Sequence, residues 1–166
     1  MPYGSISSSS TIGAPYFLTR FETEPYDLGA YSDLQPVIDH FAGSFKRESL
    51  ALRAGFHSWS LFDPTWAGSE CAPGEGPLEC EIRVHRPAIV IIRVGSNDGV
   101  ARDAYEKNVR RALDYAVAQG VIPVLSTKAD RKEGSDANNE VLRALAAEYE
   151  LPLWDWDALA ATLPNR

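Results

Sequence analysis

The stretch Arg86–Val100, RPAIVIIRVGSNDGV, decides the fold that this sequence predicts. Pro87 can open a strand, because the first position of a strand does not need its N–H group. The run from Ala88 to Val94 is almost continuously apolar and rich in β-branched residues, which is typical of a strand buried on both faces. It ends at residues 95–99, GSNDG, which are suited to a tight loop.

The loop at residues 95–99 lies where open α/β sheets place their sites, at the end of a buried parallel strand. Asn97 offers a side-chain amide there, and Gly95 allows a ligand to approach the backbone. The alternative is that Asn-Asp-Gly forms a turn with no further role, since short motifs of this kind often occur by chance. The rest of the sequence has to decide between a site and a turn.

Length and composition predict one globular domain over residues 1–166. The chain is 45% hydrophobic and 23% charged, an ordinary balance, and it is long enough to bury a sizeable core. Its 16 Lys and Arg against 23 Asp and Glu give a net charge of −7, which argues against nucleic acid and anionic membrane surfaces as partners. No apolar run approaches the roughly 20 residues that span a bilayer, and no signal peptide is recognisable.

Strands and helices alternate along the chain, which predicts an α/β fold with a parallel sheet of about five strands and helices on both faces. The serine-rich residues 1–10 are expected to be irregular, as in a flexible linker. The other expected elements are a helix over 33–41 capped by Ser32 or Asp33, a strand over 48–54, a short helix over 58–62, a helical turn over 78–84, strands over 88–94, 121–125 and 151–154, and helices over 101–119, 138–149 and 156–163.

Two cysteines, Cys71 and Cys80, lie in the long Pro- and Gly-rich loop of residues 63–80. Two cysteines make a poor zinc site, which normally takes four ligands, so no metal is expected. We expect a disulfide that closes this loop, and it would indicate an extracellular or periplasmic protein. The alternative is a pair of free thiols in a cytoplasmic protein.

The order of these elements, together with Gly95, Asn97 and Asp98, resembles the SGNH (GDSL-like) hydrolase family. The third motif of that family is G-x-N-D, and Gly55 matches the glycine of its second motif. The likeness runs over residues 26–156, and the loop of residues 63–80 resembles an insertion in exported bacterial members. The resemblance implies a three-layer α/β/α, flavodoxin-like fold. It also implies a serine esterase, lipase or carbohydrate-ester hydrolase without a cofactor, acting on a small-molecule ester or an acylated carbohydrate.

The chemistry of the family implies a role for each matched residue. A serine attacks the ester carbonyl, and a histidine accepts its proton. Ser10 is the nucleophile candidate, because residues 8–10 take the place of the G-D-S motif. Backbone N–H groups and an asparagine amide hold the oxyanion, which implies Gly55 and Asn97 as the oxyanion hole. We expect Gly55, Asn97 and the region of Ser10 to meet at one edge of the sheet.

Two motifs of the family are incomplete in this sequence. Serines replace the Gly and Asp before the nucleophile, and no D-x-x-H follows Trp156. Three histidines lie upstream of that position. His40 and His85 are expected to be structural or exposed, and His57, close after Gly55, is the candidate base.

Two functions therefore stay open. In the first, the chain is a serine esterase whose acid–base pair is missing from this sequence, for example because a D-x-x-H lies beyond residue 166. In the second, it is a degenerate member of the family that binds a ligand or partner without turnover. A flavodoxin-like nucleotide-binding protein is a weaker third alternative, because the sequence has no Gly-rich phosphate loop.

Overall fold

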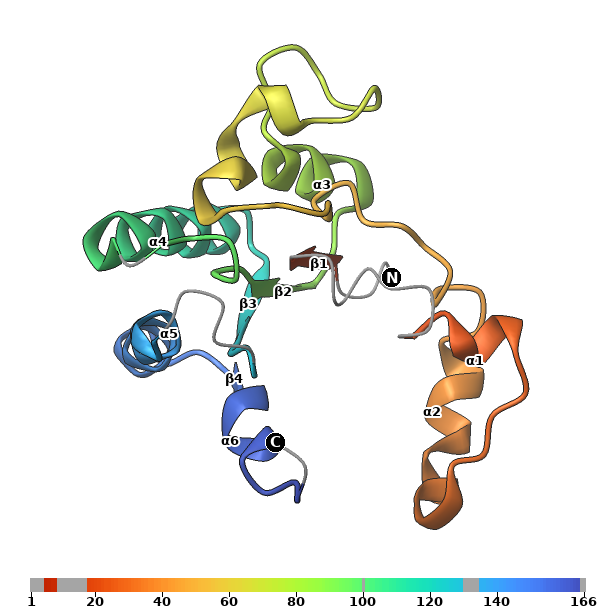
Figure 1. The fold of residues 1–166 in the computed structure, drawn as a ribbon. Helices are drawn as coiled ribbons and strands as arrows, with labels where there is room; N and C mark the ends of the chain where they lie inside the picture. Colours follow the sequence, from red (N-terminus) through yellow and green to blue (C-terminus); the bar gives the residue numbers. More distant parts are fainter. Residues whose placement is uncertain (1–4, 9–17, 100, 130–134, 165–166) are drawn as a thin grey trace.

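The computed structural model describes residues 18–99, 101–129 and 135–164, and the backbone of residues 5–8. Its centre is a sheet in the order β1-β2-β3-β4, in which every neighbouring pair of strands is parallel (Figure 1). The strands are β1 (Ser5–Ser8), β2 (Ile89–Arg93), β3 (Ile122–Ser126) and β4 (Leu153–Trp154). The predicted parallel α/β sheet is confirmed, with four strands in the described residues where about five were expected.

The helices follow the predicted order. They are α1 (Arg20–Thr23), η1 (Gly29–Leu34), α2 (Gln35–His40), η2 (Ser58–Phe62), η3 (Pro64–Trp66), α3 (Pro77–His85), α4 (Arg102–Ala118), α5 (Ala137–Glu148) and α6 (Trp156–Ala160), where η marks a 3-10 helix. The short helix over 58–62 and the long helices over 101–119 and 138–149 are confirmed within two residues at each end. The expected helical turn over 78–84 is a complete helix, α3.

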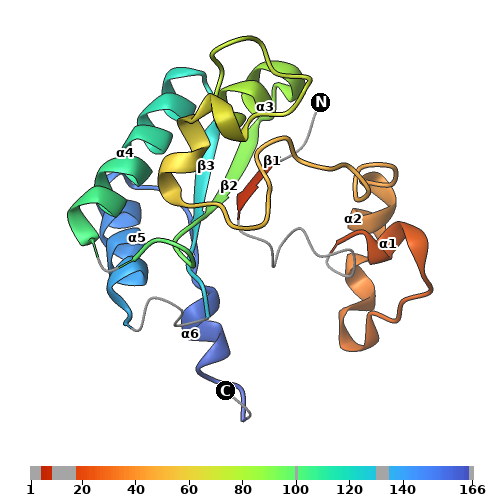
Figure 2. The same cartoon turned by 45° about the horizontal axis from the view of Figure 1, so that its top comes forward.

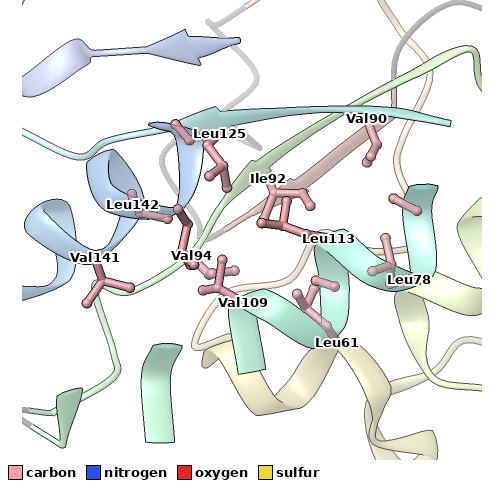
Figure 3. Close-up of a cluster of buried hydrophobic side chains, with 14 of the residues drawn as sticks. Leu61, Leu78, Val90, Ile92, Val94, Val109, Leu113, Leu125, Val141 and Leu142 are labelled. Carbon is pink, nitrogen blue, oxygen red and sulfur yellow. The ribbon is translucent and has the colours of Figure 1, made fainter. Parts of the chain in front are cut away.

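The hydrophobic core lies between the sheet and the two longest helices. Helices α4 and α5 run side by side along one face of the sheet (Figure 2). Val90 and Ile92 point from β2 toward Leu113 of α4, and all three side chains are fully buried (Figure 3). Other buried members of this core are Leu61, Leu78, Val94, Val109, Leu125, Val141 and Leu142.

The two faces of the sheet are covered unequally. Along β2 the side chains alternate between buried and partly exposed positions, since successive residues of a strand point to opposite faces. Ile89 and Ile122 are 40% and 54% exposed on the second face. The expectation of a strand buried on both faces is therefore wrong, because α4 and α5 cover only one of them. A further helix layer on the second face stays a prediction.

Three local expectations are wrong. Residues 1–10 are not wholly irregular, since Ser5–Ser8 form β1, whose parallel pairing with β2 uses backbone groups that serine has like any residue. Residues 48–54 form a turn with an isolated bridge instead of a strand. There the Leu50 N–H donates to the Glu81 carboxylate at 2.6 Å and not to a neighbouring strand. Helix α2 has no side-chain cap from Ser32 or Asp33, because η1 runs directly into it.

Residues 18–46 form an arm that stands apart from the sheet (Figures 1 and 2). The base of the arm is held by Glu81 of α3, whose side chain is fully buried. Glu81 accepts a hydrogen bond from Arg47 at 2.7 Å, besides the bond from the Leu50 N–H. A buried carboxylate needs such partners, and here they connect the arm to the body of the molecule.

The predicted disulfide between Cys71 and Cys80 is present, with the two Cα atoms 5.2 Å apart. Cys80 is buried on α3, so the bond ties the preceding loop to that helix. The loop is held a second time by Arg83, which forms an ion pair with Glu75. The segment between η3 and α3 is therefore closed by both a covalent bond and an ion pair.

Candidate functional site

The loop after β2 begins at a glycine that the fold requires. Gly95 has a φ of +123°, and a Cβ on it would lie 2.9 Å from the Tyr105 hydroxyl oxygen. That hydroxyl donates to the Val94 carbonyl at 2.9 Å, and the Asn138 amide donates to the Gly95 carbonyl at 3.0 Å. Tyr105 and Asn138 are both buried. The carbonyls of the two residues that follow β2 are thus fixed, two and three residues before Asn97.

Asn97 links this loop to the segment that contains Gly55. Its side-chain amide donates to the Phe56 carbonyl at 2.9 Å, across 41 residues of sequence. Gly55 is exposed and has a φ of +84°, a conformation that favours glycine. The structure therefore brings Asn97 against the residue that follows Gly55. The catalytic roles of these two residues stay predictions.

Asp98 holds the same two segments together through its bonds with Ser58. Both of its carboxylate oxygens accept the Ser58 N–H, at 3.0 and 2.9 Å, and one also accepts the Ser58 hydroxyl at 2.5 Å. Asn108 of α4 donates to that hydroxyl at 3.0 Å. Ser58 and Asn108 were missed in the sequence. The signal available there was a polar residue, Asn108, on the inward face of α4 beside Tyr105 and Val109.

Three aromatic side chains near Gly55 and Ser58 contact one another. They are His57, Trp59 and Trp66, and we call them the aromatic wall. The His57 ring stacks on Trp59, with 5.3 Å between ring centroids and 14° between planes. Trp59 meets Trp66 edge to face at 6.0 Å, and Trp66 in turn meets the buried Phe56 at 5.2 Å. The candidate base His57 is thus part of a ring stack.

The remaining predicted site residues lie in different places. Ser10 lies outside the described residues. β1 ends at Ser8, which pairs with Arg93, so the carboxyl ends of β1 and β2 are neighbours. His40 is exposed in the arm, with its ring against Phe41. His85 lies on α3, 3.9 Å from the Glu81 carboxylate.

Comparison with known proteins gives a match of structure alone, since no family model and no curated protein matches the sequence. The psychrotrophic esterase EstA from Pseudoalteromonas sp., in a structure inhibited by monoethylphosphonate, matches with a TM-score of 0.58 and 13% identity. That match covers 94% of this chain and 78% of EstA. The chain has the fold of the SGNH-type esterases. A serine-to-alanine variant of esterase AlinE4 also matches, with a TM-score of 0.58 and 15% identity over 96% of this chain and 79% of that one. An aspartate-to-alanine variant of AlinE4 matches with a TM-score of 0.55 and 17% identity, over 98% of this chain and 81% of that one.

A second polar cluster lies at the carboxyl ends of β3 and β4 of this SGNH-type fold, and we call it the Arg143 cluster. Arg143 of α5 forms ion pairs with Asp136 at 3.1 Å, with Asp155 at 2.9 Å and with Asp157 at 2.7 Å. Thr127 donates to Asp155 at 2.7 Å and accepts the Asp157 N–H at 3.0 Å. Hydrogen bonds from Arg143, above all, lower the pKa of Asp155 to about 2.

The Arg143 cluster was not predicted from the sequence. Its members come from residues 127–157, and no local pattern predicts that they meet. In the part of the chain that the structure describes, no group of three or more His, Cys, Asp or Glu side chains is arranged to hold a metal ion. None of the described helices is long and apolar enough to cross a membrane.

Proposed function

We propose that this protein is a serine ester hydrolase of the SGNH type, with Ser10 as nucleophile and with the Gly55 N–H and the Asn97 amide as oxyanion hole. The observation that carries the proposal is the hydrogen bond from Asn97 to Phe56, next to Gly55 and at the end of the strand beside β1. The full three-layer, flavodoxin-like arrangement over residues 1–166 is part of the proposal.

The donors of the proposed oxyanion hole are still available for a ligand. A side-chain amide has two N–H bonds, and the Phe56 carbonyl occupies one of those of Asn97. Among the described residues, none accepts a hydrogen bond from the Gly55 N–H, and Gly55 is exposed. Donors fixed in advance at the position of the developing charge stabilise the transition state, and losing one costs about 10²–10³ in kcat.

The proposed proton acceptor for Ser10 is His57. His57 is the nearest histidine in sequence to the proposed oxyanion hole, and its ring stacks on Trp59. No histidine follows Trp156 in the sequence. An unactivated hydroxyl is a poor nucleophile at neutral pH. We therefore expect slow hydrolysis of activated esters by this chain.

Hydrolysis of p-nitrophenyl acetate by the 166-residue protein tests the proposal. We expect slow turnover that is abolished in Ser10→Ala and about 100-fold lower in Asn97→Ala. Gln119→Ala, an exposed amide at the end of α4, is the matched control and is expected to leave the rate unchanged. His57→Ala abolishes turnover if His57 is the base. If turnover is the same in the Ser10, Asn97 and His57 variants as in the unmodified protein, the site is elsewhere.

A covalent probe separates the esterase from the alternative of a domain that binds without turnover. EstA is inhibited by monoethylphosphonate in its structure, so an activated ethylphosphonate ester is a suitable probe here. Labelling of Ser10, located by mass spectrometry, is the expected result. If neither labelling nor turnover is observed, a domain that binds without turnover becomes the proposed function.

The disulfide supports an extracellular or periplasmic location, because disulfides persist in oxidising compartments. Thiol titration of unfolded protein isolated from its natural source under non-reducing conditions is the test. We expect no free thiol from Cys71 or Cys80, and two free thiols per chain would speak for the cytoplasm.

A further inference from the structure

We propose that the protein forms a symmetric dimer in which the arm of each chain, residues 18–46, covers the second face of the sheet of the other chain. Two apolar surfaces, one on the sheet and one on the arm, are left uncovered in a single chain, and the dimer brings them together. Such an assembly does not depend on the proposed esterase function.

The surface on the sheet is a strip of apolar side chains that the register of β2 and β3 places side by side. Ile89 pairs with Ile122, and Ile91 pairs with Val124. All four alternate with the buried positions of their strands, so they point to the face that α4 and α5 do not cover. Trp154 of β4 is exposed as well, and we call these five residues the sheet strip. Contiguous apolar side chains on a protein surface mark an interaction site.

The arm has no core of its own. None of its residues 18–46 is buried, and a segment of this length is not stable in water without a surface to pack against. Leu34 and Val37 lie three residues apart where η1 continues into α2, which places them on one side of the helix, and both are exposed. Tyr31, three residues earlier, is also exposed. These three residues, which we call the arm face, need a cover as the sheet strip does.

The attachment of the arm favours a second copy over the sheet of the same chain. Arg47 and Leu50 follow the arm directly, and both donate to the fully buried carboxylate of Glu81, at 2.7 and 2.6 Å. The arm stands apart from its own sheet on this base (Figures 1 and 2). Turning it onto that sheet would strain or break bonds to a buried charge, which is strongly unfavourable. A second copy reaches both surfaces as they stand.

The charges of the two surfaces are complementary. Residues 18–46 contain five Asp and Glu against one Arg and one Lys. Arg93 is the one charged residue of β2, β3 and β4, and it lies on the same face as the sheet strip. On the arm, Asp33 is exposed directly beside Leu34 of the arm face. Opposite charges at the border of an apolar contact fix the orientation in which two copies meet.

Twofold symmetry makes each of these contacts twice. An arm face on the sheet strip of the partner implies the reverse contact in the same dimer, so both surfaces of both chains are buried together. The arm helices of the second copy then supply the layer that the second face of the sheet lacks in a single chain.

Sedimentation velocity over a range of protein concentrations tests the dimer. We expect a reversible monomer–dimer equilibrium. Ile122→Asp and Val37→Asp should each weaken association about 100-fold, because each places a charge in an apolar contact. Val117→Asp is the matched control, since Val117 at the end of α4 is 54% exposed, as Ile122 is, but lies outside both surfaces. It should change the dissociation constant less than twofold. Thermal unfolding checks that each variant is folded.

Cross-linking separates a contact between chains from closure of the arm within one chain. A chain with Val37→Cys is mixed with a longer, tagged chain with Ile122→Cys, and a flexible bismaleimide is added. Cys71 and Cys80 do not react, because they are bonded to each other. We expect a product that contains one copy of each chain. A double variant that is cross-linked only within single chains would show that the arm closes on its own sheet.

Four results would overturn the dimer. They are a monomer at every concentration up to the solubility limit, a dimer that both Ile122→Asp and Val37→Asp leave intact, equal weakening in Ile122→Asp and Val117→Asp, and cross-linking only within single chains.

Discussion

The loop after β2 and the Arg143 cluster both lie at carboxyl ends of the parallel strands, yet their polar groups are used differently. Around Asn97 the amide of Asn97 donates to the Phe56 carbonyl, and the one carboxylate, Asp98, accepts the N–H and the hydroxyl of Ser58. The second N–H of the Asn97 amide is left for a ligand. In the Arg143 cluster three carboxylates surround one guanidinium. The Thr127 hydroxyl also donates to the Asp155 carboxylate and accepts the N–H of Asp157.

The groups around Asn97 form the proposed site, and the groups of the Arg143 cluster stabilise the fold. Groups that bind a ligand must keep hydrogen-bonding capacity in reserve, and groups that hold the fold together use that capacity on one another. Removing a member of the Arg143 cluster should therefore affect stability, and removing Asn97 should affect the reaction. The predictions below test this division in order of expected effect.

The largest effect on stability is expected for Arg143→Ala. It removes the ion pairs with Asp155 at 2.9 Å and with Asp157, whose side chain is only 8% exposed, at 2.7 Å. Breaking a buried pair costs about 3–5 kcal/mol, and because Arg143 itself is 33% exposed we expect about 2–3 kcal/mol from urea unfolding.

Arg102→Ala is the control for this substitution. Arg102 also pairs with a carboxylate, that of Glu140 at 3.2 Å, but the two side chains are 50% and 56% exposed. An exposed pair of this kind contributes about 0–1 kcal/mol. Equal losses of stability in the Arg143 and Arg102 variants would contradict the structural role of the Arg143 cluster.

The next effect concerns pH. The pKa of Asp155 is lowered from 3.8 to about 2 in the folded protein, mainly by its hydrogen bonds to Arg143. The contribution of ionised Asp155 to the free energy of unfolding is therefore complete well above pH 4. It is lost as the pH falls through 4 toward 2, because Asp155 takes up its proton at a higher pH in the unfolded chain than in the folded protein. This shift corresponds to about 2 kcal/mol.

Urea unfolding at pH 6, 4, 3 and 2.5 measures this dependence. Other carboxylates titrate in the same range, so the informative quantity is the difference between the unmodified protein and Arg143→Ala. That difference should shrink as the pH falls. A difference that stays constant down to pH 2.5 would show that Asp155 does not titrate with a lowered pKa.

The smallest effect is expected for Ser58→Ala. The hydroxyl of this buried serine donates to Asp98 and accepts from Asn108, but the Ser58 N–H keeps both of its contacts with Asp98. We expect a loss of about 1 kcal/mol in the free energy of unfolding. Ser69→Ala removes an exposed hydroxyl and should cost less than half as much. Equal costs would mean that Asp98 is held by the backbone alone.

Local patterns predicted the elements of the fold well where a periodic apolar face existed. Helices α4 and α5 and strands β2 and β3 were found within two residues, because each buries one face against the same core. The strand expected over residues 48–54 failed, since Glu81 supplies the bond that a neighbouring strand would have made. That carboxylate lies 31 residues away, beyond the reach of any local pattern.

The candidate site was predicted in part, and partly for the wrong reason. Gly55 was expected beside Asn97 as the end of a neighbouring strand. It does not follow a strand, and the contact arises instead from the hydrogen bond of Asn97 to Phe56 and from Asp98 on Ser58. The aromatic wall was not predicted, because contacts between rings of separate turns depend on how those turns pack.

The arm of residues 18–46 has a practical consequence. It stands away from the sheet, and its base is held by the Glu81 carboxylate (Figure 2). At its turn after α2, Gly43 has a φ of +87°, and no atom lies within 4 Å of the position of an added Cβ. A peptide tag or a fluorescent domain inserted there would extend outward from the molecule. The protein thus offers an attachment point for immobilisation on a surface or bead, on an arm that stands apart from the sheet.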